Sequence, residues 1–563
     1  MHVVLPSNRI LRTMALCAAA SLLVPAGAAR SAPAPNLLNG RIKHVFVIFQ
    51  ENHSFDNYFG TFPGAENLAS PLAQSHGFRQ LDPIGNTWVT PFRIADPDTE
   101  SPGHSRTLSL AKDDGGKLDQ FVAVQETASK KKYGDAAARA VGMLTMAHYD
   151  CDTIPFLWKY AKTFVLFDHI FEGMNTPSTP NNIEVIAGQA GQTQWARDPK
   201  SGWIVDTKPG VPVINDLEPK DGPNDSASDK APQVPQQYAT LMLALAGTDG
   251  AQATNQRAGV DADLNATVAS GRAPIPWGWY QEGYISPVAA YAGYEAHHNG
   301  LQYFGYLRNN DVFWKNVHDA KTMLAQLNAG TLGDQGVFYI KGSSRNEFGW
   351  KPANKDPVVQ ANWLGDDDHP GYGDSDAQIG ESFVATFVNA VARSKYWNDS
   401  AIVVAWDDSG GYWDHVPPPN FELCADGKPC GDGSRIPFLV ISPFARSGAI
   451  VQDSGDTASI VKFAETVFGL PALATLPDEK PYMPMGPRDA LPVITDLSGA
   501  FDPARLNGTV PPIPASDAEI PDAEVNAFPP SMNCRALNVT PIAVPNTSSS
   551  PPAGFTPRVA HTN

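Results

Sequence analysis

The chain has 563 residues, a hydrophobic content of 42% and a formal net charge of −18 at pH 7. This length and hydrophobic content suffice for one large globular core that carries insertions. The excess of acidic residues argues against nucleic acid as a partner, because an anionic surface repels a polyphosphate, whereas a small phosphorylated substrate is compatible with it.

The first 28 residues have the layout of a secretory signal peptide. Arg9 and Arg12 precede an apolar run over residues 14–24, and small residues follow at 26–28. We expect cleavage after Ala28 and export to the periplasm or the medium. Because no other segment approaches the ~20 apolar residues that span a bilayer, we expect no stable membrane anchor.

Apolar runs and helical patterns alternate along the rest of the chain. Strands are predicted at residues 45–49, 164–167, 401–406 and 435–442, and helices at 118–125, 136–149, from near 153, 378–392 and 458–468. This βα alternation predicts an α/β fold with a mostly parallel sheet, flanked by helices and interrupted by loop-rich insertions. Functional sites are then expected at the carboxyl ends of the strands.

Three regions are predicted from composition. They are a signal peptide at residues 1–28, a catalytic domain at 29–496 and a Pro-rich extension at 497–563. Roughly the last 15 residues of the extension are expected to be disordered. The aromatic segment at residues 277–306 is interpreted as core packing, with a wall of the substrate cleft as the alternative.

Four cysteines remain after removal of the signal peptide, an even number in a compartment that permits disulfides. Cys424 and Cys430 are the predicted pair. For Cys151 and Cys534, which lie far apart in the sequence, free buried thiols are the alternative.

Two of the predicted strands end in oxygen ligands. One strand is followed by Glu51 and Asn52, and another by Asp407 and Asp408. Three carboxylates and an amide at one sheet edge would repel one another unless a cation neutralised them, and oxygen donors suit a hard divalent ion. The sequence therefore predicts a divalent metal site without identifying the metal. The alternative, that each pair caps a following helix or turn, holds equally well for either pair alone and is weakened because both follow strands.

A stiff loop at residues 176–182, Thr-Pro-Ser-Thr-Pro-Asn-Asn, surrounds Ser178. A serine hydroxyl is a poor nucleophile at its free pKa and needs a base or a metal to activate it, so a rigid loop beside the predicted cation would make chemical sense. Most segments rich in Ser, Pro and Asn are only turns, and the loop alone is weak support for catalysis.

Five histidines lie in sequence contexts that suggest a phosphoryl site. An imidazolium can bind phosphoryl oxygens or protonate a leaving oxygen, and its pKa of about 6.5 allows this in mildly acidic medium. Each of them alone is more often a surface or hydrogen-bonded histidine, so their joint occurrence carries the argument. They are His104, His297, His298, His369 and His415.

Five motifs, in order, resemble those of the bacterial phosphoesterase family that includes phospholipase C enzymes and secreted acid phosphatases. They are QENHSFDNYFG, GMNTPSTPNN, AHHN, DDDHPG and WDDSGGYWDHVPPP, and the resemblance spans roughly residues 42–468. The AHHN segment and the paired aspartates are closer to the acid phosphatase branch than to the phospholipase branch, where an Asp-Glu pair is usual. Two departures, His53 where the family often has Arg and Thr176 where Gly is common before the Pro-Ser, concern substrate preference and loop shape more than the chemistry.

The resemblance implies an alkaline-phosphatase-like core that holds one divalent metal ion. The implied metal ligands are Glu51, Asn52, Asp407 and Asp408, together with Ser178, which is also the implied nucleophile. Such a site joins the two strand ends to the Ser178 loop.

The resemblance also implies which side chains contact the phosphoryl group. His104, His298 and His369 would surround it as catalytic residues, and His297 and Asn181 would bind the substrate. All five lie within the quoted motifs or, for His104, in the Ser-Pro-Gly-His segment between them.

Together these inferences predict a secreted, metal-dependent phosphoester hydrolase, specifically an acid phosphatase that acts on phosphomonoesters through a phosphoserine intermediate. A phospholipase C that cleaves phospholipid head groups is the alternative, so the expected partner is a small phosphorylated substrate or a phospholipid. A sulfatase is less compatible, because its loop needs Arg where this chain has Asn182. A secreted binding protein without activity would be expected to lack a ligand or the nucleophile, and none of those residues is missing.

Overall fold

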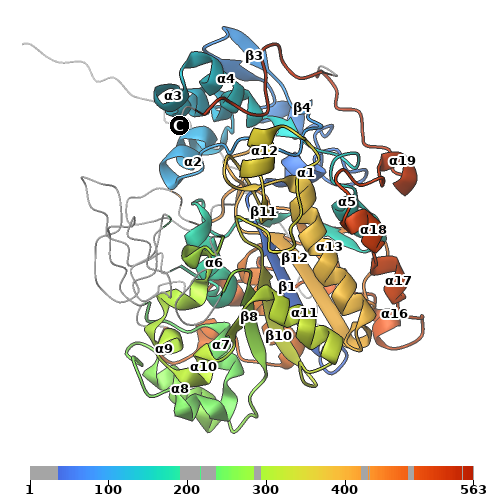
Figure 1. The fold of residues 1–563 in the computed structure, drawn as a ribbon. Helices are drawn as coiled ribbons and strands as arrows, with labels where there is room; N and C mark the ends of the chain where they lie inside the picture. Colours follow the sequence, from blue (N-terminus) through green and yellow to red (C-terminus); the bar gives the residue numbers. More distant parts are fainter. Residues whose placement is uncertain are drawn as a thin grey trace, which may run out of the picture. The chain divides into compact units, whose positions relative to one another are not determined.

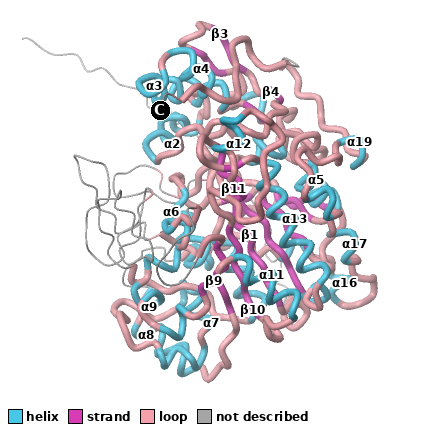
Figure 2. Tube along the Cα trace, in the orientation of Figure 1, coloured by secondary structure: helices cyan, strands magenta, loops and turns pink. Residues whose placement is uncertain are grey.

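A large sheet runs through the centre of the molecule (Figures 1 and 2). The computed structural model describes residues 36–190, 216, 236–284, 293–419, 429, 431–479, 487–547 and 550–561. The described residues from Leu37 onward belong to one compact unit. The predicted signal peptide lies outside the described residues.

Eight described strands form the central sheet. In spatial order they are β14 (Ala449–Val451), β6 (Val165–Phe167), β13 (Phe438–Ile441), β12 (Ser400–Trp406), β1 (His44–Gln50), β10 (Gly336–Lys341), β8 (Trp277–Gln281) and β9 (Val317–His318). The five strands from β12 to β9 are parallel, and β13 runs antiparallel to both of its neighbours. The predicted α/β class with a mostly parallel sheet is therefore confirmed.

The central strands are apolar along their whole length because helices cover the sheet. All seven residues of β1 are buried, so its sequence is a continuous apolar run and does not alternate with polar residues. Helices α11 (Ala320–Ala329) and α13 (Ala377–Arg393) lie side by side in front of the strands in Figure 1. Helix α6 (Ser178–Ala187) packs against α14 (Ala458–Phe468), and Tyr339 of β10 donates a hydrogen bond to the Val185 carbonyl of α6.

Local signals explain where the main helices begin and end. Asp376 caps α13 by accepting hydrogen bonds from the amides of Gln378 and Ile379, and α6 ends at Gly188, which adopts a left-handed φ of 65°. The remaining helices of eight or more residues are α2 (Arg106–Asp113), α3 (Phe121–Tyr133), α4 (Asp135–Leu144), α5 (Pro155–Thr163) and α8 (Asp261–Ala269).

Two sequence expectations about local structure have clear outcomes. Trp277 and Trp279 are buried in strand β8, so this described part of the aromatic segment is core, as expected. Ser178, expected in a stiff loop, is instead the first residue of α6. Pro180 fits the first turn of that helix because amides there have no partner within the helix.

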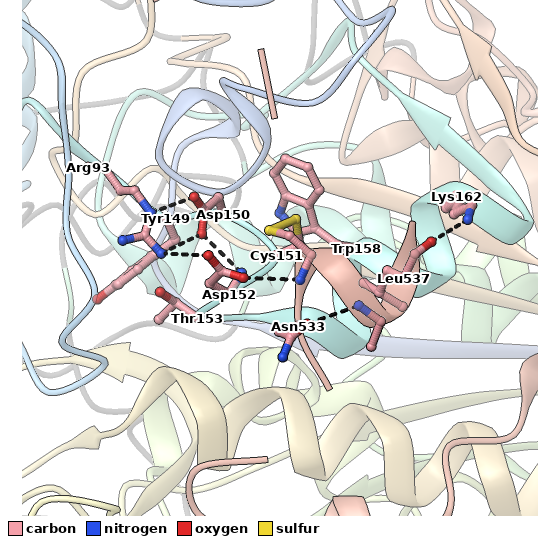
Figure 3. The surroundings of a disulfide bond; sticks show 12 residues. Arg93, Tyr149, Asp150, Cys151, Asp152, Thr153, Trp158, Lys162, Asn533 and Leu537 are labelled. Atoms are coloured by element: carbon pink, nitrogen blue, oxygen red, sulfur yellow. Dashed lines mark hydrogen bonds and ion pairs between the residues drawn. A yellow bond between two sulfur atoms is a disulfide. The ribbon is translucent and has the colours of Figure 1, made fainter. Parts of the chain in front are cut away.

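Among the described residues, a disulfide joins Cys151 to Cys534 across a sequence separation of 383 residues. The alternative of free buried thiols at these two positions is therefore wrong. Figure 3 shows the bond beside Trp158, with Asp152 accepting a hydrogen bond from the Cys534 amide at 3.1 Å. Cys424 and Cys430, the predicted pair, lie outside the described residues.

The C-terminal segment packs onto the rest of the molecule. Residues 550–561, which we expected to be disordered, make defined contacts: Arg139 donates to the Ala553 carbonyl at 2.8 Å, and Arg558 forms an ion pair with Asp96 at 2.6 Å. The Pro-rich composition is therefore compatible with order here, because arginine and backbone contacts replace regular secondary structure. None of the described helices combines the length and the apolar character that crossing a bilayer requires.

Candidate active site

The carboxyl ends of two adjacent central strands bring four acceptor side chains together. Glu51 and Asn52 follow β1, and Asp407 and Asp408 follow β12. The two strands are in register up to their last residues, and the Asp407 amide continues the ladder by donating to the Gln50 carbonyl at 3.0 Å. The four side chains therefore emerge at the same level of the sheet and are all buried.

Ser178 lies beside these acceptors at the N-terminus of α6. Its Oγ is 3.2 Å from Asp408 Oδ2 and 3.4 Å from Asn52 Oδ1. Asn182, one turn further along the helix, donates to Asp407 Oδ2 at 3.3 Å. The helix thus supplies the hydroxyl and one amide to the two strand ends.

Glu51 is held by two buried donors on one of its oxygens. Lys341 Nζ, at the end of β10, is 2.6 Å from Glu51 Oε1, and His298 Nδ1 is 2.7 Å from the same oxygen. Burial alone would raise the pKa of Glu51, but His298 and Lys341 outweigh it and hold that pKa well below its usual range. Glu51 Oε2 accepts no hydrogen bond from the described residues.

The donor set fits a divalent cation. Burial and the neighbouring Glu51 charge raise the pKa of Asp407 to about 8, and burial with the Asp407 charge raises that of Asp408 well above its usual range. These shifts mean that the described side chains alone do not neutralise the negative charges of both aspartates. The site is thus an oxygen-rich, anionic cradle of the kind that a hard divalent ion occupies. It consists of the two aspartates, the Glu51 oxygen that accepts no hydrogen bond from the described residues and the Asn52 amide oxygen.

His104 and His369 lie next to each other at one side of the cradle. Their ring centroids are 5.9 Å apart. His104 belongs to residues 96–105, the His104 loop. Its Nδ1 donates to the Pro102 carbonyl at 3.0 Å, while its Nε2 is 3.3 Å from Asn52 Nδ2. This contact turns the amide oxygen of Asn52 toward Ser178.

His369 belongs to residues 365–376, the His369 segment. Burial by itself would lower the pKa of His369, but the carboxylate of Asp374, 3.3 Å from Nδ1, and the nearby Glu51 raise it well above the usual value. Burial and the charge of His369 lower the pKa of His104 to about 4. His369 is therefore the protonated member of the pair and His104 the neutral one.

The structure gives His297 and His298 different surroundings. His298 is buried between two carboxylates, with Glu51 on Nδ1 and Glu295 Oε2 at 3.2 Å from Nε2. The contacts of His298 therefore orient Glu51, and His298 itself does not lie on an open surface. His297 is partly exposed, 3.9 Å from Glu295, and its ring lies 4.1 Å from that of His298.

Asn181 differs most from its expected place. Its side-chain oxygen accepts from the Met174 amide at 2.9 Å, and its nitrogen donates to the carbonyls of Met174 and Thr176. The amide is thus occupied with the backbone before Ser178, where it holds the chain that leads into α6. These are backbone contacts, and the role of Asn181 in substrate binding stays a prediction.

Two further histidines lie in buried structural contacts. His53 stacks on Tyr58 with ring centroids 4.1 Å apart and bonds to Asn57 Oδ1 at 2.7 Å, and its pKa falls to about 3 mainly through burial. His415 forms a buried ion pair with Asp56 at 2.6 Å. Burial alone would lower the pKa of His415, but this pairing raises it to about 9.

Sequence reasoning missed two buried groups that hold the site together. Lys112 Nζ donates to the carbonyls of Gly103, at 2.6 Å, and Gly411, at 3.0 Å, and so joins the His104 loop to the chain after Asp408. Glu172 accepts from the Ser409 amide at 2.7 Å. Neither position stands out in a helix or loop pattern.

Lys341 was also missed, although a signal for it exists. It is a charged residue at the end of the buried run GVFYIK, which is the same pattern that indicated Glu51 and Asp407. Asp216 is a further residue near the site that the sequence did not indicate. It accepts a hydrogen bond from the Thr179 amide at 3.0 Å, next to Ser178. It lies in a polar insertion without any periodicity.

A serine hydroxyl, three carboxylates and an amide lie together at the carboxyl edge of a mostly parallel sheet, which is where α/β folds bind their ligands. The comparison with known families assigns the chain further. Residues 42–471 match the Phosphoesterase family, and the chain belongs to that family. All ten predicted site residues, from Glu51 to Asp408, lie within the matched span.

Among curated proteins, the chain is similar to bacterial phospholipases C. It is 25% identical over 507 residues to the non-hemolytic phospholipase C of Burkholderia pseudomallei, covering 85% of this chain and 62% of that protein. It is 24% identical over 475 residues to phospholipase C A of Mycobacterium tuberculosis, covering 78% of this chain and 75% of that protein. The chain thus spans less than two thirds of the length of the first of these relatives.

Among solved structures, a protein in the alkaline phosphatase superfamily from Vibrio parahaemolyticus has a TM-score of 0.29 at 10% sequence identity. That comparison covers 77% of this chain and 67% of the other. A likeness this low carries no information on activity.

Proposed function

We propose that the protein is an exported, metal-dependent phosphoester hydrolase that uses Ser178 as its nucleophile. The observation that carries the proposal is the position of Ser178 Oγ, 3.2 Å from Asp408 Oδ2 and 3.4 Å from Asn52 Oδ1, where two strand ends and a helix N-terminus meet. A helix N-terminus favours the negative charge of a phosphoryl group through its amides and its dipole.

In the first step Ser178 Oγ attacks phosphorus. The new Oγ–P bond forms as the bond from phosphorus to the leaving oxygen breaks, which gives a phosphoserine. The hydroxyl proton is released to solvent, and Asp408 Oδ2, which accepts the hydrogen bond of the hydroxyl, orients Oγ. The leaving oxygen takes a proton from His369, which its ion pair with Asp374 keeps protonated.

In the second step water attacks the phosphoserine. The water gives its proton to His369, the Oγ–P bond breaks, and Ser178 takes back a proton from solvent, so every group returns to its starting state. His104 keeps Asn52 oriented throughout by its contact with the amide nitrogen.

Glu51, Asn52, Asp407, Asp408 and Ser178 would hold one divalent metal ion. When bound, such an ion lowers the pKa of a serine hydroxyl and stabilises negative charge on phosphoryl oxygens. Lys341 and His298 occupy Glu51 Oε1 and so leave Oε2 for this role.

For the substrate we propose a phosphomonoester, as in an acid phosphatase. Ser178 is 2% exposed and the four acceptors are at most 1% exposed. A terminal phosphoryl group carries one substituent and needs less room at such a buried site than the diester of a phospholipid, which carries two. The second candidate is a phospholipase C, favoured by the names of the relatives at 24–25% identity.

The test compares two substrates with wild type and Ser178→Ala, each with and without a chelator. Release of phosphate from p-nitrophenyl phosphate supports the monoester proposal, and release of phosphocholine from phosphatidylcholine supports the second candidate. Loss of both activities in Ser178→Ala, with an unchanged circular dichroism spectrum, supports the nucleophile. A Ser178→Ala variant that turns over at the wild-type rate refutes it.

A further inference from the structure

The C-terminal strap, residues 550–561, contacts the His104 loop through Glu100. The Glu100 amide donates to the Pro557 carbonyl at 2.9 Å. In return, Glu100 Oε1 accepts from the Val559 amide at 3.1 Å and lies 2.9 Å from His561 Nε2. Glu100 is buried, and two of these contacts fix its side chain and one its backbone, four residues before His104.

Arg558 of the strap binds the beginning of the same loop. Its Nη1 lies 2.6 Å from Asp96 Oδ1 and donates to the Asp98 carbonyl at 2.9 Å. The loop is therefore held at its start by Arg558 and in its middle by His561. Charge-assisted bonds of this kind are stronger than neutral ones, and here they act on a segment without regular secondary structure.

His561 also reaches the second histidine-bearing segment. Its ring stacks on Tyr372 with centroids 4.0 Å apart and an interplanar angle of 24°. Tyr372 lies three residues after His369 and two before Asp374, the carboxylate that pairs with His369. One side chain of the strap thus contacts both segments that carry the paired histidines.

The His104 loop and the His369 segment are themselves joined under the strap. Two hydrogen bonds join residues just outside the two ends of the His369 segment to the His104 loop, Trp363 Nε1 to the Thr99 carbonyl at 3.1 Å and the Ala377 amide to the Pro97 carbonyl at 3.3 Å. A shift of either segment would change the 5.9 Å separation of the two imidazole rings.

We propose that the C-terminal strap positions His104 and His369 for the reaction, with Arg558 and His561 as its positioning residues. This inference rests on the proposed function, because it assigns those histidines to the phosphoryl site. Neither residue of the strap touches the acceptor cradle. Their effect is on the geometry of two loops, and misplacing a catalytic group by about 1 Å can cost about 100-fold in rate.

The test uses the full chain with Arg558→Ala and His561→Ala combined. We expect kcat on p-nitrophenyl phosphate to fall by about 10-fold to 100-fold, with a smaller change in KM. Amide hydrogen exchange should accelerate in residues 96–105 and 365–376 and stay unchanged in α11. Arg558→Lys, which keeps the charge opposite Asp96, should recover part of the activity lost by Arg558→Ala.

Arg393→Ala is the matched control. Arg393, at the far end of α13, also binds the C-terminal extension through Glu519 and Asp522, each at 2.8 Å, but contacts neither histidine segment. It should leave kcat within about twofold. Unchanged exchange in both segments of the double variant, or faster exchange with unchanged kcat, overturns the positioning role. A wild type without phosphoester hydrolysis overturns the proposed function, and the exchange data still decide whether the strap orders the loops.

Discussion

Replacing Lys341 by methionine removes one of the two cationic donors that hold Glu51. Lys341 Nζ and Glu51 Oε1 are 2.6 Å apart, and their side chains are 1% and 0% exposed. At an effective dielectric constant of about 20, two charges at this distance attract by about 6 kcal/mol. The variant also loses the cost of burying the ammonium, so the net loss expected for breaking such a buried pair is about 3–5 kcal/mol.

The assay is urea unfolding of the chelator-treated protein, so that bound metal does not contribute. A double-mutant cycle with Glu51→Gln separates the pair from each residue alone. Lys341→Met leaves the Glu51 charge without this partner, and Glu51→Gln removes that charge. The cycle should therefore give a coupling energy of about 1–3 kcal/mol. Lys321→Met is the matched control, since its pair with Glu347 is half exposed and should contribute about 1 kcal/mol or less.

Additive effects in this cycle, or a Lys341→Met variant as stable as wild type, would refute the account of how Glu51 is held. The account also requires that Lys341→Met bind a divalent cation with altered affinity in a titration. The reason is that Glu51 then keeps only His298 on Oε1.

Three other predictions concern stability and the joining of loops. The pKa of His415 is about 9 in the folded protein and about 6.5 in the unfolded chain. Its ion pair therefore contributes stability that is fully present below pH 6.5 and is lost as the pH rises through 9. Urea unfolding should show a loss of about 3 kcal/mol over this window that His415→Gln lacks, and an equal loss in both proteins would contradict it. Replacing Cys151 and Cys534 together by serine should lower the free energy of unfolding by about 3–5 kcal/mol, below the ~6 kcal/mol that chain entropy alone gives for a 383-residue separation; reductant should destabilise wild type more than the variant, and equal destabilisation of the two would contradict this. Lys112→Met should lower kcat by about 10-fold or more because its ammonium joins two loops of the site, and a kcat within twofold of wild type would contradict this.

The sheet and its strand ends were accessible from the sequence because buried parallel strands are continuous apolar runs. The runs before Glu51 and Asp407 end sharply on carboxylates, and adjacent parallel strands place such ends together. The same rule, applied to the run that ends in Lys341, would have found the cation beside Glu51. The apolar runs therefore located the part of the candidate site that follows the two strands, which is Glu51, Asn52, Asp407 and Asp408.

Contacts between distant segments were not accessible in this way. Nothing in the sequence around Cys151 points to Cys534, because a disulfide depends on the path of the whole chain between the two residues. The order of the C-terminal strap was missed for a similar reason. Its composition is that of a disordered tail, and its order comes from side chains such as Arg558 that bind partners more than 400 residues away.

Individual roles within a motif were also beyond the sequence. The pattern that contains Asn181 predicts a site without indicating which amide faces the substrate and which holds the backbone. His298 and His369 looked equivalent, yet one is enclosed by two carboxylates and the other is paired with Asp374 next to His104. These differences follow from rotamers and burial, which a one-dimensional pattern does not contain.

The most direct test of the central claim is to identify the covalent intermediate. Wild-type protein is mixed with a phosphomonoester, quenched in acid within milliseconds and digested for mass spectrometry. The account predicts a phosphorylated peptide with the phosphoryl group on Ser178, and none in Ser178→Ala. A phosphoryl group on another residue, or turnover by Ser178→Ala at the wild-type rate, would contradict it.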